Sequence, residues 1–355
     1  MSPERRILAK EHLAPFLRKL AKGHRLVAPV AMPPGDTRLA VVEDLDRTPL
    51  DLEHPSQISA KPFLFPQEEV LFTYQGGPAT GGGLFVPVYH SIPTVYFALR
   101  SCDVSALLYQ DVVFLHRAKD PYYARRRHNA VLISLACNTP FPHCFCNATR
   151  SGPFLEHGFD LQLTDLGDRF YVESGRRRGE EILARWPQFF RPAGPEEARA
   201  QYQLSLEARG AFPRPVPVLT ACQRLARGEV PEEVWLALSA RCQDCGGCAY
   251  LCPTCTCFTI TDHQTSATGG ERRRAWDACT FAGFTRMAGG HNPVDRRRHG
   301  IRERFSHKLL HDFRQHGRPS CVGCGRCVGI CFGGVDIVRF IDLACGLDAR
   351  WARLG

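Results

Sequence analysis

The sequence lacks the long apolar run that a membrane-spanning helix needs. Nowhere do 18 or more apolar residues follow one another, so no membrane span is expected. The first 25 residues, MSPERRILAKEHLAPFLRKLAKGHR, are charged throughout and lack the apolar centre and small-residue cleavage site of a signal peptide. We interpret this segment as an amphipathic surface helix and expect a cytoplasmic protein.

Nucleotide-binding and hydrolytic motifs are also missing. No G-x-G-x-x-G follows a strand, and the Gly-rich stretch GGPATGGG over 76–83 lacks the Lys-Ser/Thr pair of a P-loop. We expect a flexible hairpin there. The sequence contains no zinc-protease or Ser-hydrolase motif and no fingerprint of a flavin. We therefore assign no catalytic residue and expect no substrate site in this chain.

Cysteine, by contrast, is abundant. The chain has 17 cysteines in 355 residues, whereas a secreted disulfide scaffold would be small and would carry a signal peptide. The odd number excludes complete disulfide pairing. With 44% hydrophobic and 23% charged residues, the chain can bury an ordinary core. These features favour thiolate ligation of metal in a reducing compartment.

Eight cysteines form two runs with the same spacing, C-x2-C-x2-C-x3-C, over 241–253 and 320–332. This is the spacing of bacterial two-cluster ferredoxins, in which three cysteines wrap one cubane and the fourth binds the other cluster. We therefore assign the cysteines crosswise. One [4Fe–4S] cluster takes Cys242, Cys245, Cys248 and Cys331, and the second takes Cys321, Cys324, Cys327 and Cys252.

The residues around the two runs refine this assignment. Gly246, Gly247, Gly323 and Gly325 permit tight turns whose N–H groups point at sulfur. Structural zinc is the alternative, since it also uses C-x2-C pairs, but two such four-cysteine runs are uncommon for zinc. Between the runs, IRERFSHKLLHDFRQHG over 301–317 reads as helix. This favours a helical two-cluster domain over the compact β-hairpin ferredoxin.

Three further cysteines, Cys255, Cys257 and Cys279, lie near the first run. They are one too few for another four-ligand cluster. We interpret them as packing residues, or as thiols that lie next to a cluster without binding it.

The N-terminal part predicts a mixed α/β domain. The apolar segments 94–100 and 129–136 read as buried strands that end at Cys102 and Cys137, and Ser101 or Asp103 is a plausible N-cap of the helix that follows. The carboxyl edge of such a sheet is where ligands bind.

Two more cysteines, Cys144 and Cys146, follow in the Pro-rich segment NTPFPHCFCN. Together with Cys102 and Cys137 they could bind a third cluster, with Asp103 or His143 replacing one thiol. The alternative is a set of reduced cysteines, with or without a redox pair.

We place a domain boundary near residue 235. Residues 1–235 form the mixed α/β domain, and residues 236–355 form a helical ferredoxin domain with two clusters. The segment 210–220 is Pro-rich and could be a linker. A helix over 231–240, with Pro231 at its start, leads into the first cysteine run.

The combined motifs resemble one family. RCQDCGGCAYLCPTCTCF, GERRRAWDACTF, MAGGHNP, HKL and CVGCGRCVGIC, with RSCDVSAL, DPYYARRR and CNTPFPHCFC upstream, resemble the iron–sulfur beta subunit of cytoplasmic NiFe sulfhydrogenases. The A subunit of anaerobic sulfite reductase is similar. The resemblance implies an electron relay between a flavin- and NAD(P)-binding subunit and a catalytic NiFe or sulfite-reducing subunit. The resemblance implies that the eight ferredoxin cysteines are cluster ligands, and it implies the same less closely for the four N-terminal cysteines.

Charge bears on the remaining hypotheses. Residues 271–318 hold 12 Lys/Arg against 5 Asp/Glu, a net charge of +7 within a chain of +9. The segment lacks the aromatic pattern of single-strand binders, so we expect a scaffold facing a partner protein rather than nucleic acid. Two other functions compete with the relay: a self-sufficient sulfur or polysulfide reductase using the N-terminal thiols, and a cluster-bearing regulatory or nucleic-acid-binding module.

Overall fold

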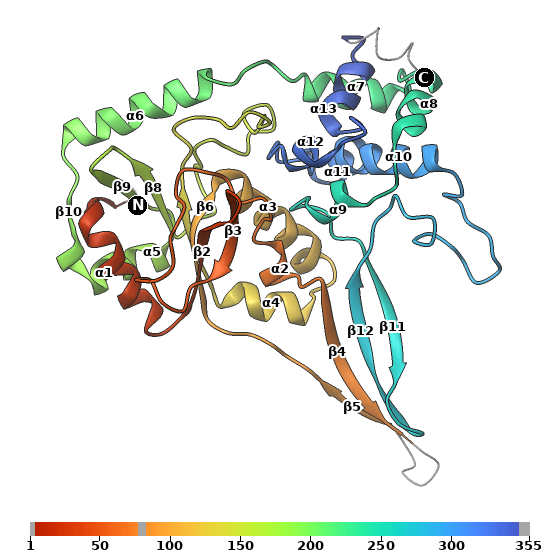
Figure 1. The fold of residues 1–355 in the computed structure, drawn as a ribbon, viewed down its shortest axis with the longest axis horizontal. Helices are drawn as coiled ribbons and strands as arrows, with labels where there is room; N and C mark the ends of the chain where they lie inside the picture. Colours follow the sequence, from red (N-terminus) through yellow and green to blue (C-terminus); the bar gives the residue numbers. More distant parts are fainter. Residues whose placement is uncertain (1–3, 77–82, 348–355) are drawn as a thin grey trace.

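An eight-stranded sheet organises the N-terminal half of the molecule (Figure 1). The computed structural model describes residues 4–76 and 83–347. The strand order is β10-β1-β9-β8-β7-β6-β2-β3, and the central strands β2, β6, β7 and β8 run parallel. The strands are β1 Arg5–Ala9, β2 Arg25–Met32, β3 Asp36–Val41, β6 Thr94–Arg100, β7 Ala130–Leu135, β8 Leu161–Asp165, β9 Arg169–Ser174 and β10 Phe190–Pro192.

Helices cover both faces of this sheet. Alternate residues of β6 point to opposite sides, so Val95 packs with one apolar layer and Tyr96 with the other. The first layer includes α1 (Lys10–Ala21) and α5 (Arg177–Arg185), and the second includes α2 (Lys61–Leu64), α3 (Ser101–Asp111) and α4 (Pro121–His128). A π-helical turn over Val112–His116 continues α3. The N-terminal segment predicted as one helix is thus strand β1 followed by α1.

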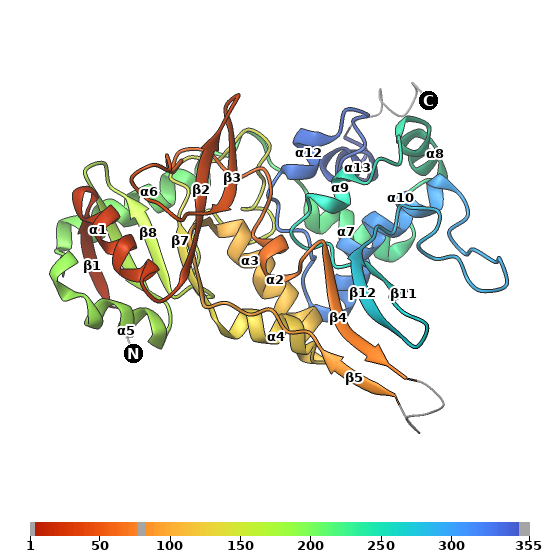
Figure 2. The ribbon, with the colours of Figure 1, turned by 60° about the horizontal axis from the view of Figure 1, so that its bottom comes forward.

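A second sheet projects from the body of the protein (Figures 1 and 2). Its order is β11-β12-β4-β5, with β4 Glu68–Gln75, β5 Leu84–Pro87, β11 Phe258–Gln264 and β12 Gly269–Trp276. Residues 77–82 of the predicted hairpin lie outside the described residues, and the flanking strands β4 and β5 pair antiparallel. Residues 258–276, between the two cysteine runs, thus form a β-hairpin that pairs with β4, and the helix expected between the runs lies farther along the chain.

Helices form the rest of the regular secondary structure in the C-terminal part. They are α7 Val218–Arg227, α8 Glu232–Arg241, α9 Gly247–Tyr250, α10 Arg297–Ser306, a π-helical turn over His307–His311, α11 Asp312–His316, α12 Arg326–Ile330 and α13 Ile337–Ala344. Trp235, Phe305 and Phe340 stack at their centre, with ring centroids 4.9 and 4.6 Å apart. The predicted helix over 301–317 is confirmed as α10, the π-turn and α11. Pro231 is the N-cap of α8 rather than its first residue.

Long α6 (Pro195–Gly210) leads from the large sheet toward the helices, and residues 211–217 connect it to α7 (Figure 1). Helix α7 precedes residue 235 but packs in the same core as α10 and α13. The boundary at residue 235 stays a prediction. No helix in the described part of the chain combines the length and the apolar character needed to cross a bilayer.

Candidate metal centres

The two cysteine runs fold into loops with the same backbone. Asp244 and Gly323, each two residues after the first cysteine of its run, have φ of 50° and 61°. Gly246 and Gly325, each directly after the second cysteine, have φ of 71° and 76°. Left-handed backbone suits Gly, and Asp adopts it more readily than most side chains. Each loop then enters a short helix, α9 or α12.

Backbone N–H groups in these loops point at thiol sulfurs. The N–H of Gly323 donates to Cys321 Sγ at 3.5 Å, and the N–H of Val335 donates to Cys331 Sγ at 3.1 Å. The backbone N–H of Asp244 makes the corresponding bond to Cys242. Hydrogen bonds of this kind stabilise negative charge on sulfur, as cluster ligation requires. The predicted role of Gly323 is therefore seen in the structure.

The eight thiols gather crosswise into two sets. The first quartet lines one cavity, together with the buried Oγ1 of Thr280, which lacks a hydrogen-bond partner. The second quartet is a mutually neighbouring set in which Cys252 joins the three cysteines of the other run. The first quartet is Cys242, Cys245, Cys248 and Cys331, and the second is Cys252, Cys321, Cys324 and Cys327.

Thiol spacing in these quartets differs from that of a site for one ion. Within residues 4–76 and 83–347, no three His, Cys, Asp or Glu side chains lie close enough together to bind a single metal ion. Around a cubane each thiolate binds its own iron, so four thiolates spread around a larger body than a zinc ion. The crossed quartets and the N–H···S bonds fit such a cluster.

Burial makes the free thiols weak acids. It raises the pKa of Cys321 to about 12 and that of Cys242 to about 11, and it raises the pKa of Cys327 well above its usual value. A buried thiol loses its proton only when positive charge compensates the thiolate. Ligation to iron supplies that compensation, because metal binding releases the thiol proton.

Three buried cations surround the segment 252–257. Lys61, Arg304 and Lys308 are 2%, 4% and 3% exposed. No carboxylate in the described part of the chain forms an ion pair with any of them, although buried cations are normally paired. Their positive charge therefore faces the thiols, and it is these cations that sequence reasoning did not single out.

Each of these cations contacts the cysteine-rich segment directly. Arg304 donates to Cys248 O at 2.8 Å and to Cys255 Sγ at 3.7 Å. Lys308, on the π-turn, donates to both Thr254 O and Thr254 Oγ1 at 2.9 Å, and Lys61 donates to Cys255 O at 3.3 Å. Two of the three lie in the basic segment noted in the sequence. Lys61 comes from a distant segment and carries no sequence signal.

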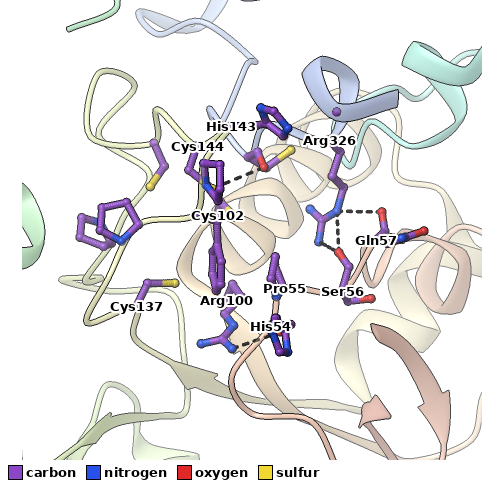
Figure 3. Close-up of a pocket in the computed structure, with 18 of the residues that line it drawn as sticks. His54, Pro55, Ser56, Gln57, Arg100, Cys102, Cys137, His143, Cys144 and Arg326 are labelled. Carbon is purple, nitrogen blue, oxygen red and sulfur yellow. Dashed lines mark hydrogen bonds between the residues drawn. The ribbon is translucent and has the colours of Figure 1, made fainter. Parts of the chain in front are cut away.

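The four N-terminal cysteines line a cavity of about 400 Å³ (Figure 3). The two predicted strands are β6 and β7, which are parallel neighbours, and Cys102 and Cys137 follow their carboxyl ends. The loop after β7 brings Cys144 and Cys146 to the same cavity. Burial raises the pKa of Cys144 to about 12, and Arg100, also in the cavity wall, donates a hydrogen bond to Cys137.

Two details of this cavity correct the sequence interpretation. Helix α3 begins at Ser101 with Arg100 as its N-cap, and no side chain caps it. Asp103 instead forms a buried ion pair with Arg326, with N–O distances of 2.7 and 3.0 Å. Asp103 is therefore neither the cap nor a free substitute ligand, whereas His143 does line the cavity.

The second cysteine run is pressed against this N-terminal loop. Phe145 N–H donates to Gly323 O at 2.8 Å. A Cβ on Gly323 would lie 2.6 Å from Phe145 backbone atoms, and a Cβ on Gly325 would lie 2.5 Å from His143 O. Both glycines are thus required for close contact as well as for the turn. Cys324, from the second quartet, lines the N-terminal cavity too.

Comparison with known proteins decides the nature of the C-terminal part. Residues 241–335 match the family model described as a 4Fe-4S dicluster domain, and the match includes both cysteine runs. We call residues 241–335, which are similar to this family, the dicluster domain. The match contains all eight cysteines of the two quartets, but it begins well after the N-terminal cysteines.

A second comparison covers nearly the whole chain. Over 338 residues the protein is 28% identical to sulfhydrogenase 2 subunit beta of Pyrococcus furiosus, which spans 94% of this chain and 96% of the relative. The predicted resemblance to the iron–sulfur beta subunit of sulfhydrogenases is thereby confirmed. At 94% of the chain, the aligned length includes the N-terminal part as well as the dicluster domain.

The basic segment 271–318 contains both ion-paired arginines and buried cations that face thiols. Arg272, Arg273 and Arg274 on β12 form ion pairs with carboxylates of the same sheet or of neighbouring segments. Arg304 and Lys308 face the thiols instead. Part of the charge of this segment is therefore paired within the protein, and two of its buried cations lie where an anionic cluster would be compensated.

Proposed function

We propose that the protein is the electron-transfer subunit of a multisubunit oxidoreductase. The observation that carries the proposal is the pair of crossed cysteine quartets, of which the second borders, through Cys324, a further cavity lined by four cysteines. Iron–sulfur clusters accept and release single electrons when bound to such thiolates. The relative's designation as a hydrogenase-type subunit supports the same role.

In this proposal the quartets hold one [4Fe–4S] cluster each. Cys242, Cys245, Cys248 and Cys331 bind the first, and Cys252, Cys321, Cys324 and Cys327 bind the second. The N–H donors of Asp244, Gly323 and Val335 lower the energy of negatively charged sulfur.

We assign the N-terminal cavity to a third cluster. Cys102, Cys137, Cys144 and Cys146 are its ligands, and Arg100 compensates charge at Cys137. Because Cys324 borders both this cavity and the second quartet, electrons pass between these two centres over a short distance. Cys245 is exposed, so the first quartet meets a partner at the surface.

The partners follow from the resemblance. A flavin- and NAD(P)-binding subunit exchanges electrons with one end of the relay, and a catalytic subunit of hydrogenase or sulfite-reductase type exchanges them with the other. The specific prediction is that hydride-linked activity disappears when the flavoprotein is omitted from the reconstituted complex. Full-rate polysulfide reduction by this chain alone would contradict the relay.

A second candidate is reduction of sulfur or polysulfide in the N-terminal cavity. It is favoured by one observation, a cavity of about 400 Å³ whose wall contains four thiols and Arg100. The two candidates differ in what the thiols do, because cluster ligands hold iron whereas catalytic thiols stay free.

Iron analysis separates these candidates. The full chain, purified without oxygen, should hold about twelve irons if three cubanes are present and about eight if only the dicluster domain is filled. The variant Cys144→Ser/Cys146→Ser should lose about four irons, while Cys222→Ser, at a buried cysteine that does not line the cavity, should lose none. Full iron retention in the double variant would exclude the third cluster, and zinc in place of iron would exclude the relay.

A further inference from the structure

Two cysteines outside all three proposed cluster sites meet at the base of the β11–β12 hairpin. Cys257 directly precedes β11, and Cys279 follows the end of β12. Phe258 pairs with Trp276, and the N–H of Asp277 donates to Cys257 O at 3.0 Å. The segments before β11 and after β12 therefore lie side by side at the base of the hairpin. The thiol and the backbone N–H of Cys279 both contact the Cys257 sulfur.

The charges around this pair make its two thiols unequal. The Cys279 contact, followed by the positive charges of His307 and Lys308, lowers the pKa of Cys257 to about 6. The same contact, followed by burial, raises the pKa of Cys279. A thiolate beside a protonated thiol is the arrangement in which one sulfur attacks a disulfide and the other resolves the mixed disulfide.

The pair also lies close to the second quartet. Cys255 contacts Cys252, a member of that quartet, and its sulfur interacts with Cys279 on the other side. Arg304 donates to the Cys255 sulfur at 3.7 Å. Cys257 and Cys279 are both partly exposed, so they can be reached from solvent while they remain near the cluster expected at Cys252.

We propose that Cys257 and Cys279 form a redox-active dithiol that reduces a small-molecule disulfide with electrons delivered by the second quartet. The Cys257 thiolate attacks one sulfur of the substrate and releases the first thiol. Cys279 then attacks the mixed disulfide, releases the second thiol and leaves a Cys257–Cys279 disulfide. That bond takes up two electrons, one at a time, together with two protons, and the dithiol is restored. The electron source rests on the relay function proposed above.

The test uses the full chain, purified anaerobically, with 2-hydroxyethyl disulfide as the probe. After exposure to the probe, free thiols are alkylated and the peptides are analysed by mass spectrometry. We expect a Cys257–Cys279 linkage in most molecules, and its disappearance when reduced methyl viologen, a one-electron donor, is added. Cys222 and Cys345, another neighbouring pair that belongs to neither quartet, should be alkylated in both samples.

The Cys279→Ser variant provides a second test, because it removes the resolving thiol. Without a resolving thiol, Cys257 should retain the probe as a stable mixed disulfide, and the iron content should equal that of the unmodified protein. Loss of iron in this variant would overturn the proposal, because Cys279 would then be a cluster ligand. Free Cys257 and Cys279 after probe treatment would overturn it as well.

Iron content and the electron paramagnetic resonance signals of the clusters are recorded on the same samples. If clusters are absent, the relay function fails, and with it the source of electrons. If clusters are present and the linkage forms but methyl viologen does not reverse it, the dithiol is not connected to them and this inference alone is overturned.

Discussion

The first and second quartets have the same loop conformation but very different surroundings. In the first, Cys245 is exposed, and Asp244 is paired at 2.7 Å with Arg297, which is itself partly exposed. In the second, the run that supplies Cys324 is packed against the N-terminal loop, and Lys308 lies buried beside Cys252. The equal spacing of the cysteines therefore produces loops with the same backbone conformation. The position of each loop in the fold decides which charges surround it and how far solvent reaches it. We expect the two clusters to differ in potential and in role.

The largest effect should come from removing a ligand. Cys245→Ser and Cys327→Ser should each cost about four irons, because each removes one cubane ligand. Only Cys327→Ser should also lower the melting temperature strongly, since its cluster would fill space between the two halves of the molecule whereas Cys245 lies at the surface. Iron analysis and thermal unfolding check this, and equal melting temperatures would contradict the distinction between the quartets.

Breaking the contact between the second run and the N-terminal loop should have the next largest effect. Gly323→Ala adds a Cβ 2.6 Å from Phe145 backbone atoms at a position with positive φ. We expect a loss of about 3 kcal/mol in unfolding free energy, from overpacking and backbone strain together.

Gly334→Ala is the matched control for this contact. Gly334 also has a positive φ, of 67°, but nothing lies within 4 Å of an added Cβ. The control should lose only about 1 kcal/mol, from backbone strain alone. Denaturant unfolding measures both variants, and equal losses would show that the contact itself is unimportant.

Removing a buried cation should change the midpoint potential of one cluster more than that of the other. Lys308→Met keeps the side-chain volume but removes a positive charge beside Cys252. Because a cation favours the reduced, more negative cluster, the midpoint potential of the second cluster should fall by roughly 60 mV, or about 1.4 kcal/mol for one electron. Arg297→Gln, at the exposed side of the first quartet, should shift its potential far less. Redox titration followed by electron paramagnetic resonance measures both shifts, and equal shifts would contradict the comparison.

The smallest expected effect concerns only the rate at which the Cys257 thiol is alkylated. Contact with Cys279 lowers the pKa of Cys257 to about 6, so its thiolate persists at neutral pH and is lost only as the pH falls through that value. Alkylation of Cys257 by iodoacetamide should therefore be about tenfold slower at pH 5 than at pH 8. Cys345, whose pKa burial raises, should react slowly throughout this range. Identical pH profiles for the two thiols would contradict the assigned electrostatics.

The sequence predicts features that depend on residues close together in the chain, and it does not predict contacts between residues far apart in the chain. The C-x2-C-x2-C-x3-C runs and strands such as 94–100 depend on neighbouring residues, and the dicluster domain and β6 are confirmed. The N-terminal cavity was foreseen because two strands end in cysteine. Lys61 could not be foreseen, since it reaches Cys255 from 194 positions away. Nor could Asp103, whose long-range ion pair with Arg326 replaced the local capping role.

The small sheet has a consequence for engineering and for evolution. Strand β12 of the dicluster domain pairs with β4, nearly 200 positions earlier in the chain, through seven pairs of facing residues. A fragment confined to residues 241–335 would expose that edge of β12 as an unpaired template for aggregation. The domain cannot therefore be transplanted as an independent electron-carrying module, and recombination between relatives would have to exchange β4 and β12 together.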